Sequence, residues 1–528
     1  MSDFHAWEAS ECEHFTDVNV SEKTVVCKRK PVPGITITIG MFFDGTGNNV
    51  FNIDNRLLNT CTNMDVGVNA EDAESCSRKL DMSDNGAGSY LGYYSNIHWL
   101  NTLYTIDAQI KIDEKTDYQV AVYVEGIGTA RDKEDSLIGM GIGEVFEGVT
   151  KKVDDAISQI SNQLKALIVT DNNITCAIDK IQFDVFGFSR GAAAARHFAN
   201  RVRNQDNVIQ QAIKTGLNGR NQHGKPAGEV RFLGLFDTVC AVGSVTNLFD
   251  VHGPVNPGVE LKLPPDIAQK VFQISAMHEV RYNFSLNSIK DSWPELALPG
   301  VHSDIGGGYN PNEQEYYFLT EPAGENINVK AVNENTLVYK NTAAKLPDLR
   351  ANPALEYILP SGEVKEECWY DYIVDMDAQR AGTIEKRVGA AITLKRIVSN
   401  DWSKVSLRVM LDAAQEAGGV FDEILPKDKN LSIHVELESL CQKAIAQGKS
   451  VRTGNALIPF SSDELLLIGK YIHCSANWNG LKFKDVWLDG KQVRTIYGAE
   501  KKVQVIGYVN MPNENWVRSV WNMQGEKA

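Results

Sequence analysis

The chain has 528 residues, of which 43% are hydrophobic and 23% charged, and this ordinary globular usage argues against disorder or a coiled coil as the main state. Lys and Arg total 53 against 68 Asp and Glu, so the net charge is −15. That balance disfavours a duplex nucleic-acid binder and adsorption to anionic membranes by bulk charge. At roughly 150 residues per domain, the length indicates more than one domain.

The first segments along the chain differ sharply in character. Residues 1–33 are polar and charged, and we expect them to form an N-terminal arm. The apolar, β-branched run at 35–43 predicts a buried strand, and the Asp-, Gly- and Asn-rich sequence at 44–49 predicts a loop after it. Residues 50–90 are rich in Asn, Asp, Ser and Gly, so we expect a long surface insertion.

Strand and helix patterns then alternate. The expected elements are a strand at 118–124, a helix at 145–168, a strand at 181–186, a helix at 189–202 and a strand at 230–236. The first helix is amphipathic, and the second is rich in alanine. Such alternation is typical of an α/β protein with a mostly parallel central sheet and flanking helices.

The pattern changes past residue 315. Amphipathic helices are expected at 403–416 and 434–446, followed by short strand-like runs and a hairpin at Asp489-Gly490. Trp402, at the start of the first helix, is expected in the core rather than at a membrane interface. The predicted domains are an arm at 1–33, a catalytic core with insertions at 34–315, and a mixed helical and β accessory region at 316–528 that contacts a membrane or a partner.

Gly187-Phe188-Ser189-Arg190-Gly191 is a GxSxG sequence between a predicted strand and a predicted helix. This context is typical of the nucleophile elbow of α/β-hydrolases, in which a strained turn lifts the serine hydroxyl clear of the sheet. A side chain at either flanking glycine would collide with neighbouring backbone. A plain strand-to-helix turn with an N-cap serine is the alternative.

A serine nucleophile needs a base and an acid that orients the base. Asp237 directly follows the predicted strand at 230–236, and His302 lies in a glycine-rich loop. Ser189, Asp237 and His302 follow the chain order of α/β-hydrolase triads. Six more histidines and aspartates stay open as weaker candidates or structural residues: His197, His252, His278, Asp184, Asp250 and Asp304.

The oxyanion of a tetrahedral intermediate needs two donors. We expect one to be the amide of Arg190, the residue after the nucleophile. The other is expected from the turn after the first strand, at Gly45 or Thr46, where glycine lets backbone approach the substrate. An Asx turn that merely ends the strand is the alternative.

Two other motifs do not support their usual chemistry. The sequence at 43–46 is similar to the nucleophile strand of haloacid-dehalogenase-like phosphatases, but Phe42 stands where the nucleophilic aspartate would be. The glycines at 139–143 miss the spacing of a dinucleotide loop by one residue. The nine cysteines contain no CxxC pair, which disfavours a zinc ribbon or a disulfide framework. We therefore expect no cofactor and no metal.

The N-terminus is acidic and lacks the apolar region of a signal peptide, and no stretch approaches about 18 apolar residues. We therefore expect synthesis in the cytoplasm without a signal peptide or transmembrane helix. Export would then need a route that reads no signal peptide.

Four segments together resemble the motif set of the DUF2235 α/β-hydrolases. They are Phe42–Asn49, Gly187–Ala192, Leu235–Val239 and Pro299–Tyr309. The length and layout are similar to the first family of type VI secretion lipase effectors. The resemblance implies an α/β-hydrolase fold with a catalytic triad of Ser189, Asp237 and His302.

The same resemblance implies an antibacterial toxin with phospholipase A activity on membrane glycerophospholipids, delivered to the periplasm of target cells. It also implies a VgrG-like spike protein as carrier and a cognate periplasmic immunity protein. The excess of acidic residues leads us to expect no nucleic-acid partner. A serine esterase or thioesterase acting on soluble substrates is the alternative function, and a non-catalytic hydrolase-fold binding module is a third.

Overall fold

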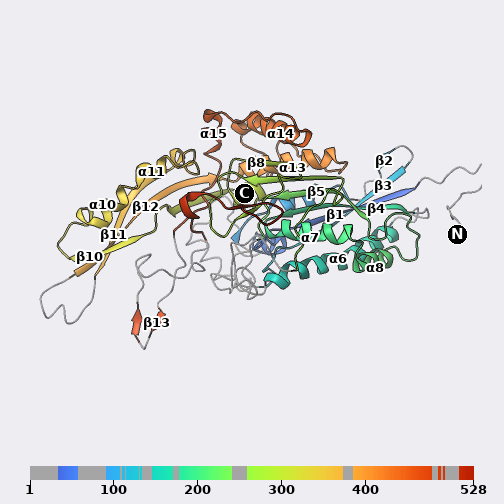
Figure 1. Ribbon diagram of the computed structural model, residues 1–528, viewed down its shortest axis with the longest axis horizontal. Coiled ribbons are helices and arrows are strands. Elements are labelled where there is room, and N and C mark those ends of the chain that lie inside the picture. The colour runs from blue at the N-terminus through green and yellow to red at the C-terminus, as the bar shows by residue number, and fades with distance from the viewer. Residues whose placement is uncertain are drawn as a thin grey trace, which may run out of the picture.

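The computed structural model describes residues 34–57, 91–106, 110–112, 115–129, 131–133, 145–170, 178–240, 258–372, 385–478, 486–488, 491–493 and 510–528. Its centre is a seven-stranded sheet (Figure 1). In spatial order the strands are β2 (Ile110–Ile112), β3 (Lys115–Val124), β1 (Ile35–Phe43), β4 (Ile178–Phe188), β5 (Glu229–Phe236), β6 (Lys270–Ala276) and β8 (Glu295–Leu298). All neighbours are parallel except β2 and β3, which confirms the expected mostly parallel sheet.

The central strands are buried on both faces, which explains why their sequences are mainly apolar. In β1 every residue except Thr36 is buried, and β4 is buried from Ile181 onward. The four strands expected from the sequence are all present: β1 has the expected bounds, β5 begins one residue earlier, and β3 and β4 are longer by a few residues. β6 and β8 complete the sheet on the side of β5.

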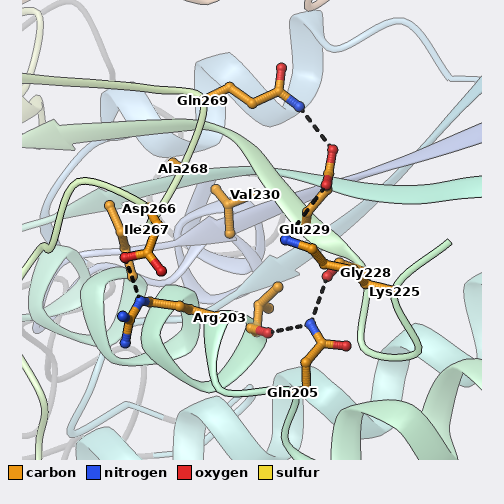
Figure 2. A pocket seen from close by; sticks show the side chains of 11 residues that line it. Arg203, Gln205, Lys225, Gly228, Glu229, Val230, Asp266, Ile267, Ala268 and Gln269 are labelled. Carbon is orange, nitrogen blue, oxygen red and sulfur yellow. Dashed lines mark hydrogen bonds and ion pairs between the residues drawn. The ribbon is translucent and has the colours of Figure 1, made fainter.

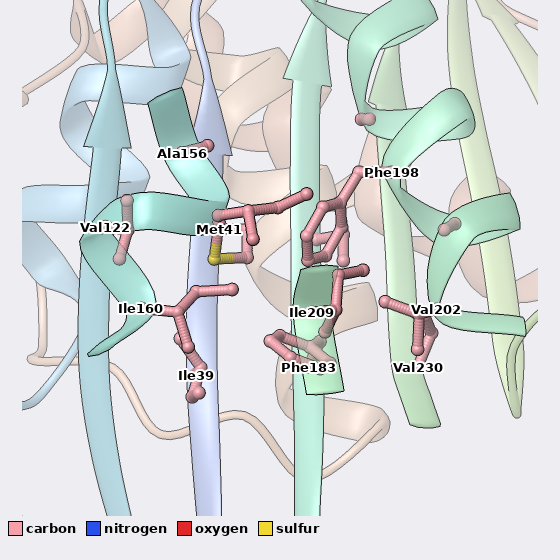
Figure 3. Close-up of a cluster of buried hydrophobic side chains, with 14 of the residues drawn as sticks. Ile39, Met41, Val122, Ala156, Ile160, Phe183, Phe198, Val202, Ile209 and Val230 are labelled. Carbon is pink, nitrogen blue, oxygen red and sulfur yellow. The ribbon is translucent and has the colours of Figure 1, made fainter. Parts of the chain in front are cut away.

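One face of the sheet is covered by α6 (Val145–Thr170) and α7 (Arg190–Arg203), with α8 (Asn207–Gly216) against α6. The apolar positions of α6 that recur every three or four residues are all buried: Val153, Ile157, Ile160, Leu164 and Leu167. They belong to one buried cluster with sheet residues such as Met41 and Phe183, and Figure 3 shows Ile160 beside Met41. This layer forms the first core, and it confirms both helices expected before residue 203.

The opposite face is covered by helices from distant parts of the chain. α4 (Asn96–Leu103) packs on β1 and β3, and α13 (Asp401–Glu416) packs on β5 and β6. α14 (Glu438–Thr453) lies against α13 (Figure 1). Phenylalanines of the sheet and the fully buried Trp402 belong to this second core. Residues past 315 therefore contribute to the same core as those before it.

A second, antiparallel sheet projects from the central one and carries α10 (Leu337–Ala343) (Figure 1). Its strands are β9 (Asn312–Phe318), β10 (Ala323–Asn328), β11 (Glu363–Tyr372) and β12 (Glu385–Ser399). The long β12 pairs with all three others. Together with the helices around it, this sheet confirms a mixed region after the α/β core.

The remaining α-helices and strands of the described residues are short: α1 (Val50–Asn55), β7 (Leu286–Asn287), α9 (His302–Gly306), α11 (Leu346–Arg350), α15 (Ser462–Ile468), β13 (Val486–Leu488), β14 (Lys491–Val493) and β15 (Val520–Trp521). β13 and β14 pair as the hairpin expected around residue 489. Where residues are described, no helix is both long and apolar enough to span a bilayer.

Several expectations lie outside the described residues. They are the arm at 1–33, most of the insertion at 50–90, the glycines at 139–143, Asp250 and His252. The division of the chain at residues 33 and 315 stays a prediction.

Candidate active site

Ser189 occupies a strained turn between β4 and α7. Its backbone has φ 57° and ψ −126°, a conformation that is costly for a residue with a side chain. Ser189 stands at the N-cap position of α7, yet its side chain makes no capping hydrogen bond. The hydroxyl therefore does not act as a helix cap, which argues against a plain strand-to-helix turn.

The two glycines of the GxSxG sequence are required by space. A Cβ on Gly187 would lie 2.5 Å from the carbonyl oxygen of Gly191. A Cβ on Gly191 would lie 2.3 Å from the carbonyl oxygen of Asp44. The start of α7 thus packs directly against the backbone that follows β1, which brings the loop at 44–49 beside the elbow.

Asp237 follows β5 as Ser189 follows β4. Phe188 and Phe236 are partners in the parallel register of the two strands, and the Ser189 amide donates to the Phe236 carbonyl at 3.0 Å. Asp237 also has a positive φ, 43°, so the chain turns sharply after both strands. Ser189 and Asp237 consequently lie side by side at the carboxyl edge of the sheet.

His302 is the first residue of α9 and pairs with Asp237. Its Nδ1 lies 2.5 Å from Asp237 Oδ2. With Nδ1–H as the donor, Nε2 is left to accept a proton. The imidazole packs against the ring of Phe188, the neighbour of Ser189, with centroids 4.6 Å apart, and against Phe284 at 5.0 Å.

Burial governs the ionisation of this pair. Burial lowers the pKa of His302 from its usual value, and the hydrogen bond to Asp237 opposes that shift. Burial alone would raise the pKa of Asp237, but Arg518 and His302 outweigh it and hold the pKa well below its usual range. A neutral imidazole beside an ionised carboxylate is the arrangement that a general base requires.

The Asp237 carboxylate has two further partners. The amide of Ala276 donates to Oδ1 at 2.9 Å. The guanidinium of Arg518 donates to Oδ1 at 2.7 Å and to Oδ2 at 2.8 Å. Sequence reasoning did not find Arg518, because no motif surrounds it and its partner lies far back in the chain.

The loop before His302 is held by its own polar network. The His302 amide donates to Glu279 Oε2 at 3.2 Å, and Glu279 forms an ion pair with Arg281. His278, a weaker candidate for the base, accepts a hydrogen bond at Nδ1 from the Gly300 amide. His278 therefore supports the loop backbone on the approach to His302.

His197, Asp304 and Asp184 each bind a different group. His197 accepts from the Glu260 amide on the far side of α7. Asp304 pairs with the buried His473, at 2.7 Å between Oδ1 and Nδ1. Asp184 forms a buried ion pair with Arg231. The structure brings none of these three into contact with the Asp237–His302 pair.

The expected oxyanion loop adjoins the elbow. The Gly45 amide donates to its neighbour's carboxylate, Asp44 Oδ1, at 2.7 Å, so that donor is already engaged. The Thr46 hydroxyl is buried and has no hydrogen-bond partner among the described residues. Arg190 is the first residue of α7, where helix amides point toward an anion. The Thr46 hydroxyl is thus still able to donate, whereas the Gly45 amide is engaged.

A pocket lies at the opposite edge of the sheet, between the end of α7 and the start of β5 (Figure 2). Its polar side chains bind one another: Arg203 pairs with Asp266, and Gln269 donates to Glu229. None of the expected site residues lines it. Among the residues with described positions, no group of three His, Cys, Asp or Glu could hold a metal ion.

A family model and solved structures match this chain. The family model "T6SS, Phospholipase effector Tle1-like, catalytic domain" matches residues 201–339, a range that contains Asp237 and His302. A solved structure, "Structure of the Tle1 effector bound to the VgrG spike from the Type 6 secretion system", is 45% identical over 98% of this chain and 100% of that one, with a TM-score of 0.75.

A second structure, of an uncharacterized protein from Pseudomonas aeruginosa, is 17% identical with a TM-score of 0.37, over 83% of this chain and 52% of that one. That likeness is too distant to inform either fold or function. The comparison with curated proteins gives no match.

Proposed function

The chain belongs to the family of Tle1-like phospholipase effectors of type VI secretion systems, and from that premise we propose that it is a serine-dependent phospholipase A. The observation that carries this proposal is the Asp237–His302 pair beside the strained Ser189 at the carboxyl edge of the sheet. The substrate is an acyl ester of a membrane glycerophospholipid.

In the proposed mechanism Ser189 Oγ attacks the acyl carbonyl carbon, and His302 Nε2 accepts the hydroxyl proton. Asp237 keeps the imidazole oriented and stabilises its charged form. His302 returns the proton to the leaving lysophospholipid oxygen, which leaves the acyl group on Ser189. Water then attacks the acyl carbonyl while His302 accepts a proton from it, and His302 returns that proton to Ser189 Oγ as the fatty acid leaves. The lowered pKa of His302 supports this role, since the free base is present at neutral pH.

The negative charge that develops on the carbonyl oxygen is stabilised by hydrogen-bond donors at the elbow and in the neighbouring loop. The amide of Arg190 and the hydroxyl or amide of Thr46 are the proposed pair. The Thr46 hydroxyl, unpartnered within the described part of the chain, supports this choice, because a buried donor without a partner is costly unless a ligand satisfies it. Gly45 can contribute only if its hydrogen bond to Asp44 opens.

Delivery follows from the family. The related Tle1 effector is bound to a VgrG spike, and we propose that a VgrG-like spike carries this chain to the periplasm of a target bacterium. A producing cell would then need a periplasmic immunity protein. Antibacterial action follows from hydrolysis of the target's membrane lipids.

The test is fatty-acid release from phospholipid vesicles by Ser189→Ala. We expect a loss of at least about a thousandfold, because the nucleophile is gone while the fold is kept. Ser406→Ala is the matched control, since Ser406, like Ser189, is a buried serine, but it lies on α13. Retained release by Ser189→Ala would remove the triad from the proposal.

The same assay separates the alternative function. A phospholipase should release fatty acid faster from vesicles or micelles than from short-chain esters kept monomeric. Equal rates on soluble esters or thioesters, with no release from vesicles, would favour a soluble-substrate esterase. A serine-directed fluorophosphonate should label the wild type and not Ser189→Ala, whereas no labelling of either would support a non-catalytic binding module.

A further inference from the structure

Arg518 reaches the Asp237 carboxylate from the last residues of the chain. Two guanidinium nitrogens contact the two carboxylate oxygens at 2.7 and 2.8 Å, a bidentate arrangement that fixes the carboxylate plane. The third nitrogen, Nε, donates to the Phe284 carbonyl at 2.7 Å. The Arg518 side chain is 7% exposed, so this ion pair is shielded from solvent.

The segment that carries Arg518 is docked along the loop that leads to His302. Its backbone exchanges hydrogen bonds with residues 280–288 on both sides of Arg518. These bonds run from Tyr282 N to Met511 O, Asn513 N to Val280 O, Leu286 N to Ser519 O, and Ser288 N to Trp521 O. β15 also pairs in parallel with β7. Arg518 is therefore held at Asp237 by a built interface.

Asp237 needs this partner because it is fully buried. Ala276 satisfies only Oδ1, and His302 binds only Oδ2. Without Arg518, only one hydrogen bond to each oxygen would hold the carboxylate, so its plane would be less restrained and the lone pair of Oδ2 would be aimed less closely at Nδ1. Phe284, whose carbonyl anchors the guanidinium, also packs its ring on the imidazole.

We propose that Arg518 is a positioning residue of the active site, which holds the Asp237 carboxylate in the plane that orients His302. This inference rests on the proposed triad. The C-terminal segment thereby completes a site whose other residues all lie before residue 303.

The charge of Arg518 has a separate effect from its geometry. Three charged groups face His302: Asp237 at the end of β5, and Glu279 and Arg281 on the preceding loop. Arg518 lies behind them, on the Asp237 carboxylate. A guanidinium on Asp237 partly cancels the negative charge that favours the imidazolium. Removing it should raise the pKa of His302, and the acid limb of the kcat/KM profile should move to higher pH.

The experiment compares three full-length variants in the vesicle assay from about pH 5 to 9. Arg518→Gln should lower kcat roughly tenfold to a hundredfold, leave KM within about twofold, and move the acid limb upward. Arg518→Lys keeps the charge but loses the two-pronged contact. It should therefore leave the acid limb near the wild-type position and recover part of kcat.

Arg452→Gln is the matched control. Arg452 lies on α14, is similarly buried, and forms ion pairs with Asp412 and Glu416. We expect it to lose stability without a change in kcat or in the acid limb. An unchanged kcat and acid limb in folded Arg518→Gln would overturn the inference. So would equal losses of kcat in Arg452→Gln and Arg518→Gln.

Two further outcomes are distinguishable. If Arg518→Gln does not fold, Arg518→Lys decides the case, since wild-type kcat in that variant would contradict a geometric role. Loss of release by Ser189→Ala together with wild-type behaviour of both Arg518 variants refutes only the positioning role. Retained release by Ser189→Ala refutes the proposed triad itself.

Discussion

Asp44, the first residue of the loop after β1, is a buried carboxyl group that no cationic side chain of the described residues contacts. The Tyr123 hydroxyl donates to Oδ2 at 2.6 Å, and the Gly45 amide donates to Oδ1. Burial raises the pKa of Asp44 from 3.8 to about 6, although these hydrogen bonds oppose the shift. The ionised form of Asp44 is therefore disfavoured in the folded protein.

This shift predicts a pH-dependent stability. Between pH 3.8 and about 6 the folded state binds more protons at Asp44 than the unfolded chain does. The protonated Asp44 carboxyl group thus makes its full contribution to the free energy of unfolding below pH 3.8, and this contribution is lost as the pH rises through about 6. Asp44→Asn should consequently exceed the wild type in free energy of unfolding at pH 8, by up to about 3 kcal/mol, and match it near pH 4.

Urea denaturation at the two pH values measures this difference. Asp155→Asn serves as the control, because Asp155 is exposed on α6 and should give the same small change at both. Equal effects of Asp44→Asn at pH 4 and pH 8 would contradict the assignment of the shifted group.

For individual residues, the sequence identifies candidates that belong to a recognisable motif. Ser189, Asp237 and His302 each stand at a strand end or in a glycine-rich loop, and the structure brings the last two into contact. Their catalytic roles stay predictions. Arg518 could not be found, because its place depends on how the final segment docks 281 residues after its partner. The Tyr123–Asp44 contact likewise depends on the register of β1 and β3.

Among the elements, α13 joins the region past residue 315 to the loop that carries His302. Trp402, in its first turn, is fully buried as expected, and its indole N–H donates to the Pro299 carbonyl at 2.6 Å. A Cβ on Gly300 would lie 3.3 Å from the indole ring. One side chain thus fixes the backbone just before His302.

Trp402→Phe should keep most of the packing but leave the Pro299 carbonyl without its donor. We expect a loss of about 1–3 kcal/mol in the free energy of unfolding, with the urea midpoint lowered and the m-value unchanged. Trp402→Ala should cost more, roughly 3–5 kcal/mol, because it also opens a cavity.

The control is Trp369→Phe, since Trp369 is only partly buried on β11 of the projecting sheet. Its urea midpoint should stay close to that of the wild type. If both phenylalanine variants lose the same stability, the Pro299 hydrogen bond is not the cause of the Trp402 effect.

The sequence reveals elements that are buried in a regular pattern and misses those that are not. β1, β4 and β5 are mainly apolar because helices cover both faces, and α6 shows its buried side every third or fourth residue. β11 reads Glu-Val-Lys-Glu-Glu-Cys-Trp-Tyr-Asp-Tyr and is largely exposed. Such a strand forms by pairing with β12, and because none of its residues is buried its sequence lacks the apolar alternation of a strand with one face in the core.

For the whole molecule, the sequence predicts a second region past residue 315, but it does not predict where that region packs on the α/β core. The helix at 401–416 comes after the projecting sheet, yet it returns to cover β5 and β6. Its amphipathic pattern predicts that one face is buried, but it does not predict which part of the protein covers that face. The final segment poses the same problem, because its docking beside β7 becomes apparent only in three dimensions.

The net charge of −15 predicts how association with a lipid vesicle, the proposed substrate, depends on salt. A strongly acidic protein is repelled by anionic vesicles, and this repulsion extends about 30 Å at 10 mM salt but only about 8 Å at 150 mM. Fatty-acid release from anionic vesicles should therefore increase several-fold between these salt concentrations. Release from zwitterionic vesicles should change less than about twofold.

Hydrolysis of a monomeric, uncharged ester over the same salt range reports any effect on the chemistry itself, and Ser189→Ala gives the background. If release from anionic vesicles is instead fastest at low salt, a local basic surface must dominate the encounter despite the overall charge. The membrane approach would then be set by one face of the protein, and basic residues on that face would become the next to replace.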